Sequence, residues 1–324
     1  MLLKTVEKKL RAPAMLILAC LALMAAADCL RADEECFVQL RHDAVQTLSL
    51  DGGFAALSFS GIEIYDPEGT LIFEELRRLD PEKSASSGNL LAVCAGESVL
   101  LYDGGGLVGE IPASGRILAL DVCSRRVAVS RQGSDYPCTV TFYEEAEPLF
   151  MRCLASGTCT ELKLAERRAC LLVKDALVFM SGTEEIARAE ATAGMHLYPT
   201  KDGVCASGKD ALYFFDWTGK CTGSYTEPFG AVQSFNGSIC VQTAAGAALL
   251  EPDGSVRAAF EDGRILSFGA GLRPVLIMGE NVLILDDNMQ TLYTIENKYI
   301  PLNVITERAA ATVFWPRAAE MHRK

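Results

Sequence analysis

The amino-acid sequence predicts an all-β fold, a β-propeller of about seven four-stranded blades, from three observations. A pattern of about 36 residues recurs along the chain, and periods of this length indicate stacked or radial units. Each unit holds short continuous or alternating apolar runs instead of apolar residues three and four apart, which favours strands over helices. Turn residues separate the runs, as in Asp51-Gly52-Gly53 and Lys201-Asp202-Gly203, and Gly, Asn and Asp tolerate the positive φ of hairpin turns.

The repeat is clearest where one strand of each unit ends, because an aromatic or apolar residue there precedes an acidic one. Ile62-Glu63-Ile64-Tyr65-Asp66 is the first copy and Val282-Leu283-Ile284-Leu285-Asp286 the last. The equivalent positions are spaced 37, 41, 36, 36, 35 and 35 residues apart, and they are Asp66, Asp103, Glu144, Met180, Asp216, Glu251 and Asp286. Seven positions predict seven blades. We expect the acidic residues to close the following turn by accepting backbone hydrogen bonds.

Individual strands can be placed within this pattern. Phe54–Phe59, Leu90–Cys94 and Val275–Met278 are the clearest runs before the landmark strand. In the second blade, the third and fourth strands are predicted near 98–103 and 107–111. The third blade is then expected to begin near Gly115.

A second internal identity and the chain ends bear on the blade count. Gly115-Arg116-Ile117-Leu118 recurs 148 residues later as Gly263-Arg264-Ile265-Leu266, which is four periods of 37. Eight blades are the alternative to seven. Two further strand-like runs between Tyr299 and Trp315 could pair with Cys36–Arg41.

The landmark also carries a resemblance to known propellers. Tyr65 to Leu71, a Tyr-Asp pair followed by a Gly-containing turn and Leu, resembles the blade ending of quinoprotein-like and WD40-like propellers. The resemblance covers about residues 44 to 296, and those groups include N-terminally anchored bacterial proteins without an assigned function. The Gly-His and Trp-Asp signatures of WD40 blades are absent, and Trp217 follows its Asp. The Trp–Gly docking pattern of quinoprotein dehydrogenases is also absent, so we expect no cofactor.

The N-terminus predicts export. Lys4, Lys8, Lys9 and Arg11 precede an uncharged run from Ala12 to Ala27, which is followed by acidic residues. A basic flank before an apolar segment favours an N-terminus in the cytoplasm and a following domain outside it. We therefore expect residues 1–30 to form a cytoplasmic basic flank and a signal-anchor, residues 36–316 the propeller, and residues 317–324 a tail.

Two alternatives to a retained anchor remain open. The apolar run is short against the roughly 20 residues that span a bilayer, and Ala25-Ala26-Ala27 offers a small-residue cleavage site. The segment could therefore be a cleaved signal peptide, which would leave a secreted protein, or a buried hydrophobic segment. The leading expectation is a single-pass protein of the cell membrane with the propeller outside the cytoplasm.

Charge and cysteine content limit the partners and the cross-links. The formal net charge is −12, which disfavours nucleic acid and anionic lipid as partners. Of the 12 cysteines, four fall at similar points of different blades, and we expect them to be buried and unpaired: Cys94, Cys170, Cys205 and Cys240. Packed sheets lie about 10 Å apart, whereas a disulfide needs Cα atoms within about 7 Å. Cys153 and Cys159 are the best candidates for a local disulfide.

The search for chemistry is mostly negative. The only histidines are His42, His196 and His322, at unrelated positions, which leaves little for a histidine-based triad or metal site. No phosphate loop, dinucleotide fingerprint or nucleophile elbow occurs. We therefore nominate no catalytic, cofactor-binding or metal-binding residue. Arg116 and Arg264, at matching repeat positions, are weak candidates for a site at the channel mouth, although pairing at a strand edge is the simpler explanation.

Two functional hypotheses follow. The first is a non-enzymatic, extracytoplasmic and membrane-anchored propeller that acts as a scaffold for protein partners or components of the cell envelope. The second is a propeller enzyme or small-ligand binder that uses the mouth of the central channel. The second predicts carboxylates or arginines that converge from several inner strands.

Overall fold

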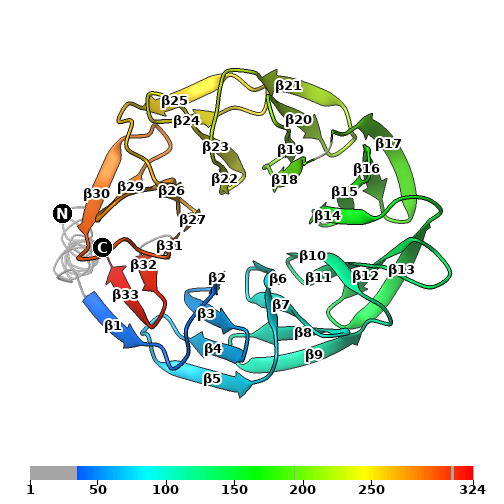
Figure 1. Cartoon of the computed structure of the whole chain (residues 1–324), viewed down its shortest axis with the longest axis horizontal. Coiled ribbons are helices and arrows are strands. Elements are labelled where there is room, and N and C mark those ends of the chain that lie inside the picture. The colour runs from blue at the N-terminus through cyan, green and yellow to red at the C-terminus, as the bar shows by residue number, and fades with distance from the viewer. Residues whose placement is uncertain (1–34, 193, 308–309, 324) are drawn as a thin grey trace, which may run out of the picture.

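A computed structural model describes residues 35–192, 194–307 and 310–323, which form a closed ring of eight β-sheets (Figure 1). The sheets are the blades of a propeller, so the predicted all-β propeller fold is confirmed. No helix in this part of the chain is long and apolar enough to cross a membrane. The predicted signal-anchor lies outside the described residues.

The chain builds one blade after another, from the innermost strand of each blade to its outermost strand. The first four blades, with strands in that order, are β2 (Gln46–Leu50), β3 (Gly53–Ser58), β4 (Gly61–Tyr65) and β5 (Leu71–Leu76); β6 (Asp80–Ser87), β7 (Leu90–Ala95), β8 (Ser98–Asp103) and β9 (Gly106–Pro112); β10 (Ile117–Cys123), β11 (Arg126–Arg131), β12 (Cys138–Glu144) and β13 (Glu147–Leu154); and β14 (Cys159–Leu164), β15 (Arg168–Val173), β16 (Ala176–Ser181) and β17 (Glu184–Glu190). The strands predicted near 98–103 and 107–111 are thus β8 and β9.

The next three blades repeat the arrangement, with one irregularity in the seventh. They are β18 (His196–Pro199), β19 (Gly203–Ser207), β20 (Leu212–Asp216) and β21 (Cys221–Tyr225); β22 (Val232–Phe235), β23 (Ser238–Gln242), β24 (Ala247–Leu250) and β25 (Val256–Phe260); and β26 (Ser267–Phe268), β28 (Val275–Met278), β29 (Asn281–Leu285) and β30 (Thr291–Glu296). The short β27 (Ala270–Gly271) leaves the seventh blade and pairs in parallel with the eighth.

The eighth blade is assembled from both ends of the described chain. It consists of β31 (Asn303–Thr306), β32 (Ala310–Trp315), β33 (Ala318–Arg323) and, as its outermost strand, β1 (Glu35–Gln39). β1 and β33 are antiparallel, with Glu35 opposite His322 and Gln39 opposite Ala318. The N-terminal strand therefore closes the ring (Figure 1).

Two sequence-based expectations change here. Eight blades, the alternative, is the correct count, because the described residues form eight sheets. Residues 317–324 were expected to be a tail, but Ala318–Arg323 is a central strand of that blade. The apolar pattern of this strand is masked by Glu320 and His322, which alternate with the buried Ala319 and Met321.

The landmark of the repeat has a structural cause. In each of the first seven blades, the register between the third and fourth strands shifts at the residue pair before the landmark turn, as at Ile64/Tyr65 and Phe142/Tyr143. A bulge of this kind bends the strand and increases its twist. The acidic residue then accepts backbone hydrogen bonds, as Asp286 Oδ1 does from Asn288 and Gln290 at 2.8 Å each. The predicted turn-closing role is therefore confirmed for Asp66, Asp103, Asp216 and Asp286.

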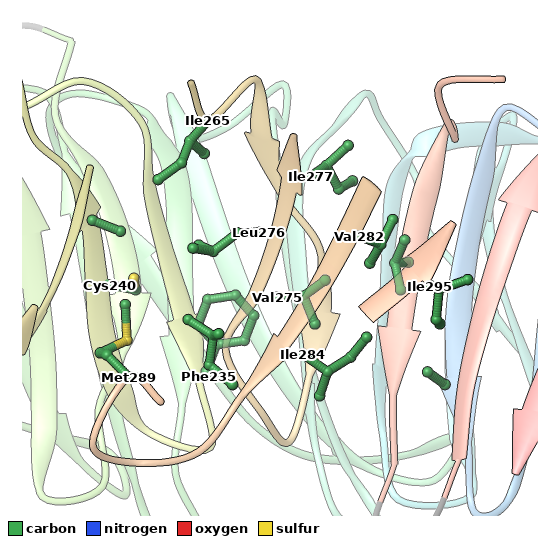
Figure 2. Packing of buried hydrophobic residues seen from close by; sticks show 14 of the residues in the cluster. Phe235, Cys240, Ile265, Val275, Leu276, Ile277, Val282, Ile284, Met289 and Ile295 are labelled. Carbon is green, nitrogen blue, oxygen red and sulfur yellow. The ribbon is translucent and has the colours of Figure 1, made fainter. Parts of the chain in front are cut away.

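The core lies between neighbouring blades. The second and third strands are buried on both faces, as in β3 and β4, which explains why they appear in the sequence as continuous apolar runs. Figure 2 shows such packing, with Leu276 of the seventh blade on the same side as Phe235 and Cys240 of the sixth, all within one buried cluster. The predicted cysteines Cys94, Cys170, Cys205 and Cys240 are all buried and free in these layers.

The antiparallel order gives the ring two different faces. One face, which we call the linker face, carries the connections between blades, such as 77–79, 113–116 and 297–302, and the turns between second and third strands. The opposite face, the turn face, carries the other hairpin turns, including the landmark turns. The strand β1 starts at the turn face, because Cys36 Sγ lies 3.4 Å from the Glu68 carbonyl oxygen and Arg323 donates to the Pro67 carbonyl oxygen.

Candidate functional site

Both arginines nominated from the sequence lie on the linker face, just before an innermost strand. Arg116 precedes β10 of the third blade and Arg264 precedes β26 of the seventh, and both are exposed. Four blades separate them in a ring of eight, so they lie on opposite sides of the channel (Figure 1). They do not share a pocket, and their role in binding stays a prediction.

Arg116 belongs to a cleft on the linker face that we call the basic cleft. The cleft has a volume of about 730 Å³. Its lining comes from the first three blades: Phe59, Arg77, Arg78, Leu79, Asp80, Lys83, Cys94, Ala95, Gly96, Arg116 and Ile117. Four cationic side chains and one carboxylate thus surround a cleft in a chain whose net charge is −12.

Backbone hydrogen bonds hold the link 77–79 in place. The N–H of Arg77 donates to the Ser60 carbonyl oxygen at 3.0 Å, and the N–H of Leu79 donates to the Phe59 carbonyl oxygen at 3.2 Å. Leu79 is itself buried. The cationic residues of this link therefore project from a fixed backbone.

The link 113–116 is held in a similar way. The N–H of Ala113 donates to the Glu97 carbonyl oxygen at 2.7 Å, and the Arg116 carbonyl oxygen accepts from the N–H of Gln132 at 2.8 Å. Gly115 allows this close approach: its φ is +114°, and a Cβ there would lie 2.1 Å from the Gln132 carbonyl oxygen. Only glycine adopts that conformation without strain.

The cationic groups of the cleft differ in their partners. Arg77 lies 3.4 Å from a Glu110 carboxylate oxygen and 3.8 Å from one of Glu75, and Lys83 pairs with Asp80 at 2.8 Å. Within the described residues, no carboxylate lies within ion-pairing distance of Arg78 or Arg116. Burial raises the pKa of the Cys94 thiol, so this wall of the cleft adds no negative charge. The cleft is consequently cationic, with two guanidinium groups directed to solvent.

A second group of polar residues lies on three successive inner strands. On β14, Lys163 Nζ lies 3.7 Å from Asp121 Oδ1 of β10, and Glu161 Oε2 lies 3.5 Å from His196 Nδ1 of β18. Tyr198 follows on β18, and burial raises its pKa, with Glu161 as a further cause. We call these five residues the channel cluster. They meet the condition set by the second functional hypothesis only in part, because two neighbouring inner strands each supply a carboxylate but the two lie in separate pairs, with Lys163 and with His196.

Asp121 is the most unusual member of the channel cluster. Burial raises the pKa of its carboxyl group, and two stabilising contacts oppose that effect: the Lys163 ammonium and the N–H of Leu164, which donates to Oδ2 at 2.8 Å. Because Lys163 compensates the charge of Asp121, this ion pair has a structural explanation: it stabilises the contact between the third and fourth blades.

One group of residues has the composition of a metal site. Glu35, Glu320 and His322 offer ligand atoms within 4.8 Å of one another. They share one face of the β1/β33 pair, because Glu35 is opposite His322 and Glu320 is two residues away. His322 lies between the two carboxylates at 3.7 and 3.8 Å, which places an ion-pairing group at the closure of the ring.

Exposed apolar side chains are unevenly distributed between the faces. Of the large ones that lie between strands in the described residues, seven belong to the linker face: Val45, Phe59, Tyr136, Leu266, Tyr299, Ile300 and Leu302. The remaining one is Leu272, in the segment that follows β27. Most of the seven lie between the seventh blade and the first, and Phe59 connects this arc to the basic cleft. The turn face instead has a smaller hollow of about 370 Å³ between the third and fourth blades.

The expected local disulfide is not present. Cys153 lies on the outermost strand of the third blade and Cys159 on the innermost strand of the fourth, and both are free. The connection between them crosses from the rim of the ring to its centre, so proximity in sequence does not bring their side chains together.

Sequence reasoning found Arg116 through the internal repeat but missed the rest of the basic cleft. The adjacent pair Arg77-Arg78 was only a weak signal, because adjacent arginines also occur at 125–126 and 167–168. Its position directly after an outermost strand is what distinguishes it. The channel cluster was missed because its members lie on three strands that are separated in sequence by about one repeat each.

Comparison of the sequence with known proteins gives no assignment: no protein-family model matches it, and neither does any curated protein. Comparison of the structure finds many propellers. BamB from Moraxella catarrhalis matches with a TM-score of 0.62 and 12% identity, over 90% of this chain and 98% of that chain. The C-terminal WD40 domain of Sif2 matches with a TM-score of 0.66 and 9% identity, over the same shares of the two chains.

A third similar structure was solved with a partner. BBS1N in complex with ARL6DN matches with a TM-score of 0.52 and 14% identity, over 88% of this chain and 92% of that chain. Identities this low show the fold alone. The resemblance to WD40-like propellers is therefore confirmed for the architecture, and the activity must be argued from the surface.

Proposed function

We propose that this protein is a non-enzymatic scaffold, anchored in the cell membrane with its propeller outside the cytoplasm, which binds a protein partner or envelope component through the linker face. The observation that carries the proposal is the gathering of exposed apolar side chains on that face. Tyr299 is 63% exposed, Ile300 58% and Phe59 57%. Exposed apolar and aromatic groups are typical of interaction sites, and folding alone gives no reason to place them there.

The position of β1 supports this use of the linker face. Because β1 enters the ring at the turn face, an N-terminal anchor would direct the turn face toward the membrane and present the linker face to partners. The turn face carries acidic residues such as Asp66 and Asp286, which disfavour contact with anionic lipid. We therefore expect the wheel to stand off the bilayer.

The location can be tested with a reporter fused after Lys324. An alkaline phosphatase fusion, active only outside the cytoplasm, should be active and should sediment with membranes. A matched fusion without residues 1–30 should be inactive. The anchored topology would be rejected if the full-length fusion had phosphatase activity only in the soluble fraction. It would also be rejected if membrane-bound phosphatase activity were found only with the fusion that lacks residues 1–30.

Partner binding can be tested by affinity capture from solubilised membranes. The full-length protein should retain a specific protein, and the double variant Tyr299→Ser/Ile300→Ser should lose it. The matched control Leu107→Ser/Val108→Ser alters exposed apolar residues of the outer strand β9 and should retain it. If no partner is recovered, or if the control loses it equally, the linker face is not the binding surface.

The channel cluster favours the second candidate function, a small-ligand or catalytic site at the channel. Glu161 and His196 form a carboxylate–imidazole pair at 3.5 Å, and His196 is 67% exposed, so a ligand could reach it. A thermal-shift screen of small polar ligands tests this version. A hit that stabilises the wild type but neither Glu161→Gln nor His196→Gln would support it.

A further inference from the structure

We propose that the basic cleft holds an extended, acidic segment of the partner protein, an inference that rests on the proposed function and specifies the chemistry of that partner. The cleft lies on the linker face beside Phe59, at the end of the apolar arc. It is thus continuous with the surface through which we propose that the partner binds.

Charge complementarity determines the type of segment. Arg78 and Arg116 approach the cleft from two different blades and have no carboxylate partner within the described part of the chain. Arginine presents its donors in a planar fork that matches a carboxylate in a bidentate manner. An acidic segment would supply the carboxylates that the protein itself does not place there.

The geometry favours a preformed site. The links 77–79 and 113–116 are each tied to a neighbouring turn by backbone hydrogen bonds, through Ser60 and Phe59 for the first and through Glu97 and Gln132 for the second. Arg77 is further held between Glu75 and Glu110. Binding would therefore order little of this protein beyond the two free guanidinium groups, which lowers the cost of association.

The lining argues for a peptide over a polyanion. Leu79, Ile117 and Ala95 line the cleft, the first two almost fully buried, and the exposed ring of Phe59 at its side offers an apolar contact. An acidic peptide with apolar side chains can use both kinds of contact. A nucleic acid would instead need a long cationic track, whereas the four cationic side chains of this cleft come only from two links and β6.

Binding of a fluorescent peptide to the purified full-length protein in detergent tests the inference. The probe is Glu-Asp-Phe-Glu-Glu-Leu-Asp-Glu, and its amidated counterpart, with Gln and Asn in place of the acids, is the neutral control. The acidic probe should bind at low salt and the neutral one should not. We expect Arg78→Glu/Arg116→Glu to weaken binding by at least about tenfold.

The repeat supplies a matched control. Arg264 occupies the position equivalent to Arg116, on the opposite side of the ring and outside the basic cleft. Arg264→Glu changes the net charge as Arg116→Glu does, and it should leave the affinity within about twofold of the wild type. An equal loss of affinity for the acidic probe in Arg116→Glu and Arg264→Glu would indicate a general charge effect and would contradict binding in the basic cleft. Absence of binding by the wild type would also contradict it.

Further outcomes separate this inference from the proposed function. If a partner captured from membranes requires Tyr299 and Ile300 but is unaffected by Arg78→Glu/Arg116→Glu, the acidic-segment inference fails and the scaffold stands. If no partner is captured by any variant, the proposed function fails. A short single-stranded oligonucleotide or phosphatidylglycerol vesicles could instead displace the peptide at a concentration below that of the peptide. That result would overturn the acidic-segment inference and indicate a phosphate-bearing ligand.

Discussion

The carboxylate of Glu63 accepts a hydrogen bond of 2.8 Å from the backbone N–H of His42. Glu63 lies on β4 of the first blade and is only 2% exposed, whereas His42 belongs to the link that leaves β1 of the eighth. The same carboxylate accepts from the N–H of Arg41 at 3.0 Å and from the hydroxyl of Tyr65. One buried charge therefore fixes the chain where the ring closes.

Replacement of Glu63 should destabilise the propeller. In Glu63→Ala, the N–H groups of Arg41 and His42 and the hydroxyl of Tyr65 lose their acceptor, and an unsatisfied buried donor costs about 1–3 kcal/mol. We expect the free energy of unfolding to fall by about 3 kcal/mol, measured by urea denaturation. The exposed Glu68, in the adjacent turn, is the control, and Glu68→Ala should change it by less than about 0.5 kcal/mol. Similar losses of unfolding free energy in Glu63→Ala and Glu68→Ala would contradict a special role of Glu63 where the ring closes.

The closing strand itself gives a second prediction. Val38 of β1 is 5% exposed and packs in the layer between the eighth and first blades, whereas its neighbour Phe37 is 64% exposed. Val38→Ala should lower the free energy of unfolding by about 2 kcal/mol because it leaves a cavity. Phe37→Ala, on the opposite face of the same strand, should have little effect. A larger loss for Phe37→Ala would mean that β1 is seated with the other face inward.

Asp121 predicts a pH-dependent difference in stability. Burial raises the pKa of its carboxyl group in the folded protein above the ordinary value of 3.8, so folding favours the protonated form. The stability that this group contributes is fully present below pH 3.8 and is lost as the pH rises through the folded-state pKa. Asp121→Asn imitates the protonated form and can still accept from the N–H of Leu164.

The measurement compares unfolding midpoints of Asp121→Asn and the wild type from pH 3.5 to 7. The variant should gain stability relative to the wild type as the pH increases, and the gain should level off above the folded-state pKa. Asp175→Asn is the control, since that carboxylate is 76% exposed and hydrated in both states. A gain that falls toward neutral pH would show that the contact with Lys163 dominates over burial.

The cysteines should differ sharply in reactivity. The thiolate is the reactive form, and burial raises the pKa of Cys205 and of Cys240 to about 12. Both should resist alkylation in the native protein and react only on unfolding. Among the described cysteines, Cys221 is exposed and should be modified first, as mapped by mass spectrometry. Equal labelling of Cys240 and Cys221 under native conditions would contradict the packing between blades.

The parts of the fold that were predictable are those set by local chemistry. A bulge followed by a turn-closing acid is encoded within a few residues, as around Tyr65 and Asp66, so the repeat was visible in the sequence. The eighth blade was harder to recognise because β1 and β33 are nearly 300 residues apart, and no local signal records their pairing. The preferred count of seven therefore omitted a blade that only tertiary structure assembles.

The same contrast applies to the surface. Arg116 was identified because its tetrapeptide recurs, but recurrence in a closed ring places the equivalent Arg264 on the far side. The residues that share the cleft with Arg116 come from the preceding links and turns, including Arg78 and Phe59. Their convergence depends on how neighbouring blades stack, and the spacing of a repeat does not reveal which residues of neighbouring blades meet.

In the proposed function, the partner binds to the linker face. In-cell photo-cross-linking tests it most directly, with a photoreactive amino acid placed at Tyr299 on the linker face or at Asp253 on the turn face of the full-length protein. We expect a discrete protein adduct from position 299, confirmed by mass spectrometry, and none from position 253. Adducts from position 253 alone, or none from either position in a membrane-localised protein, would contradict it.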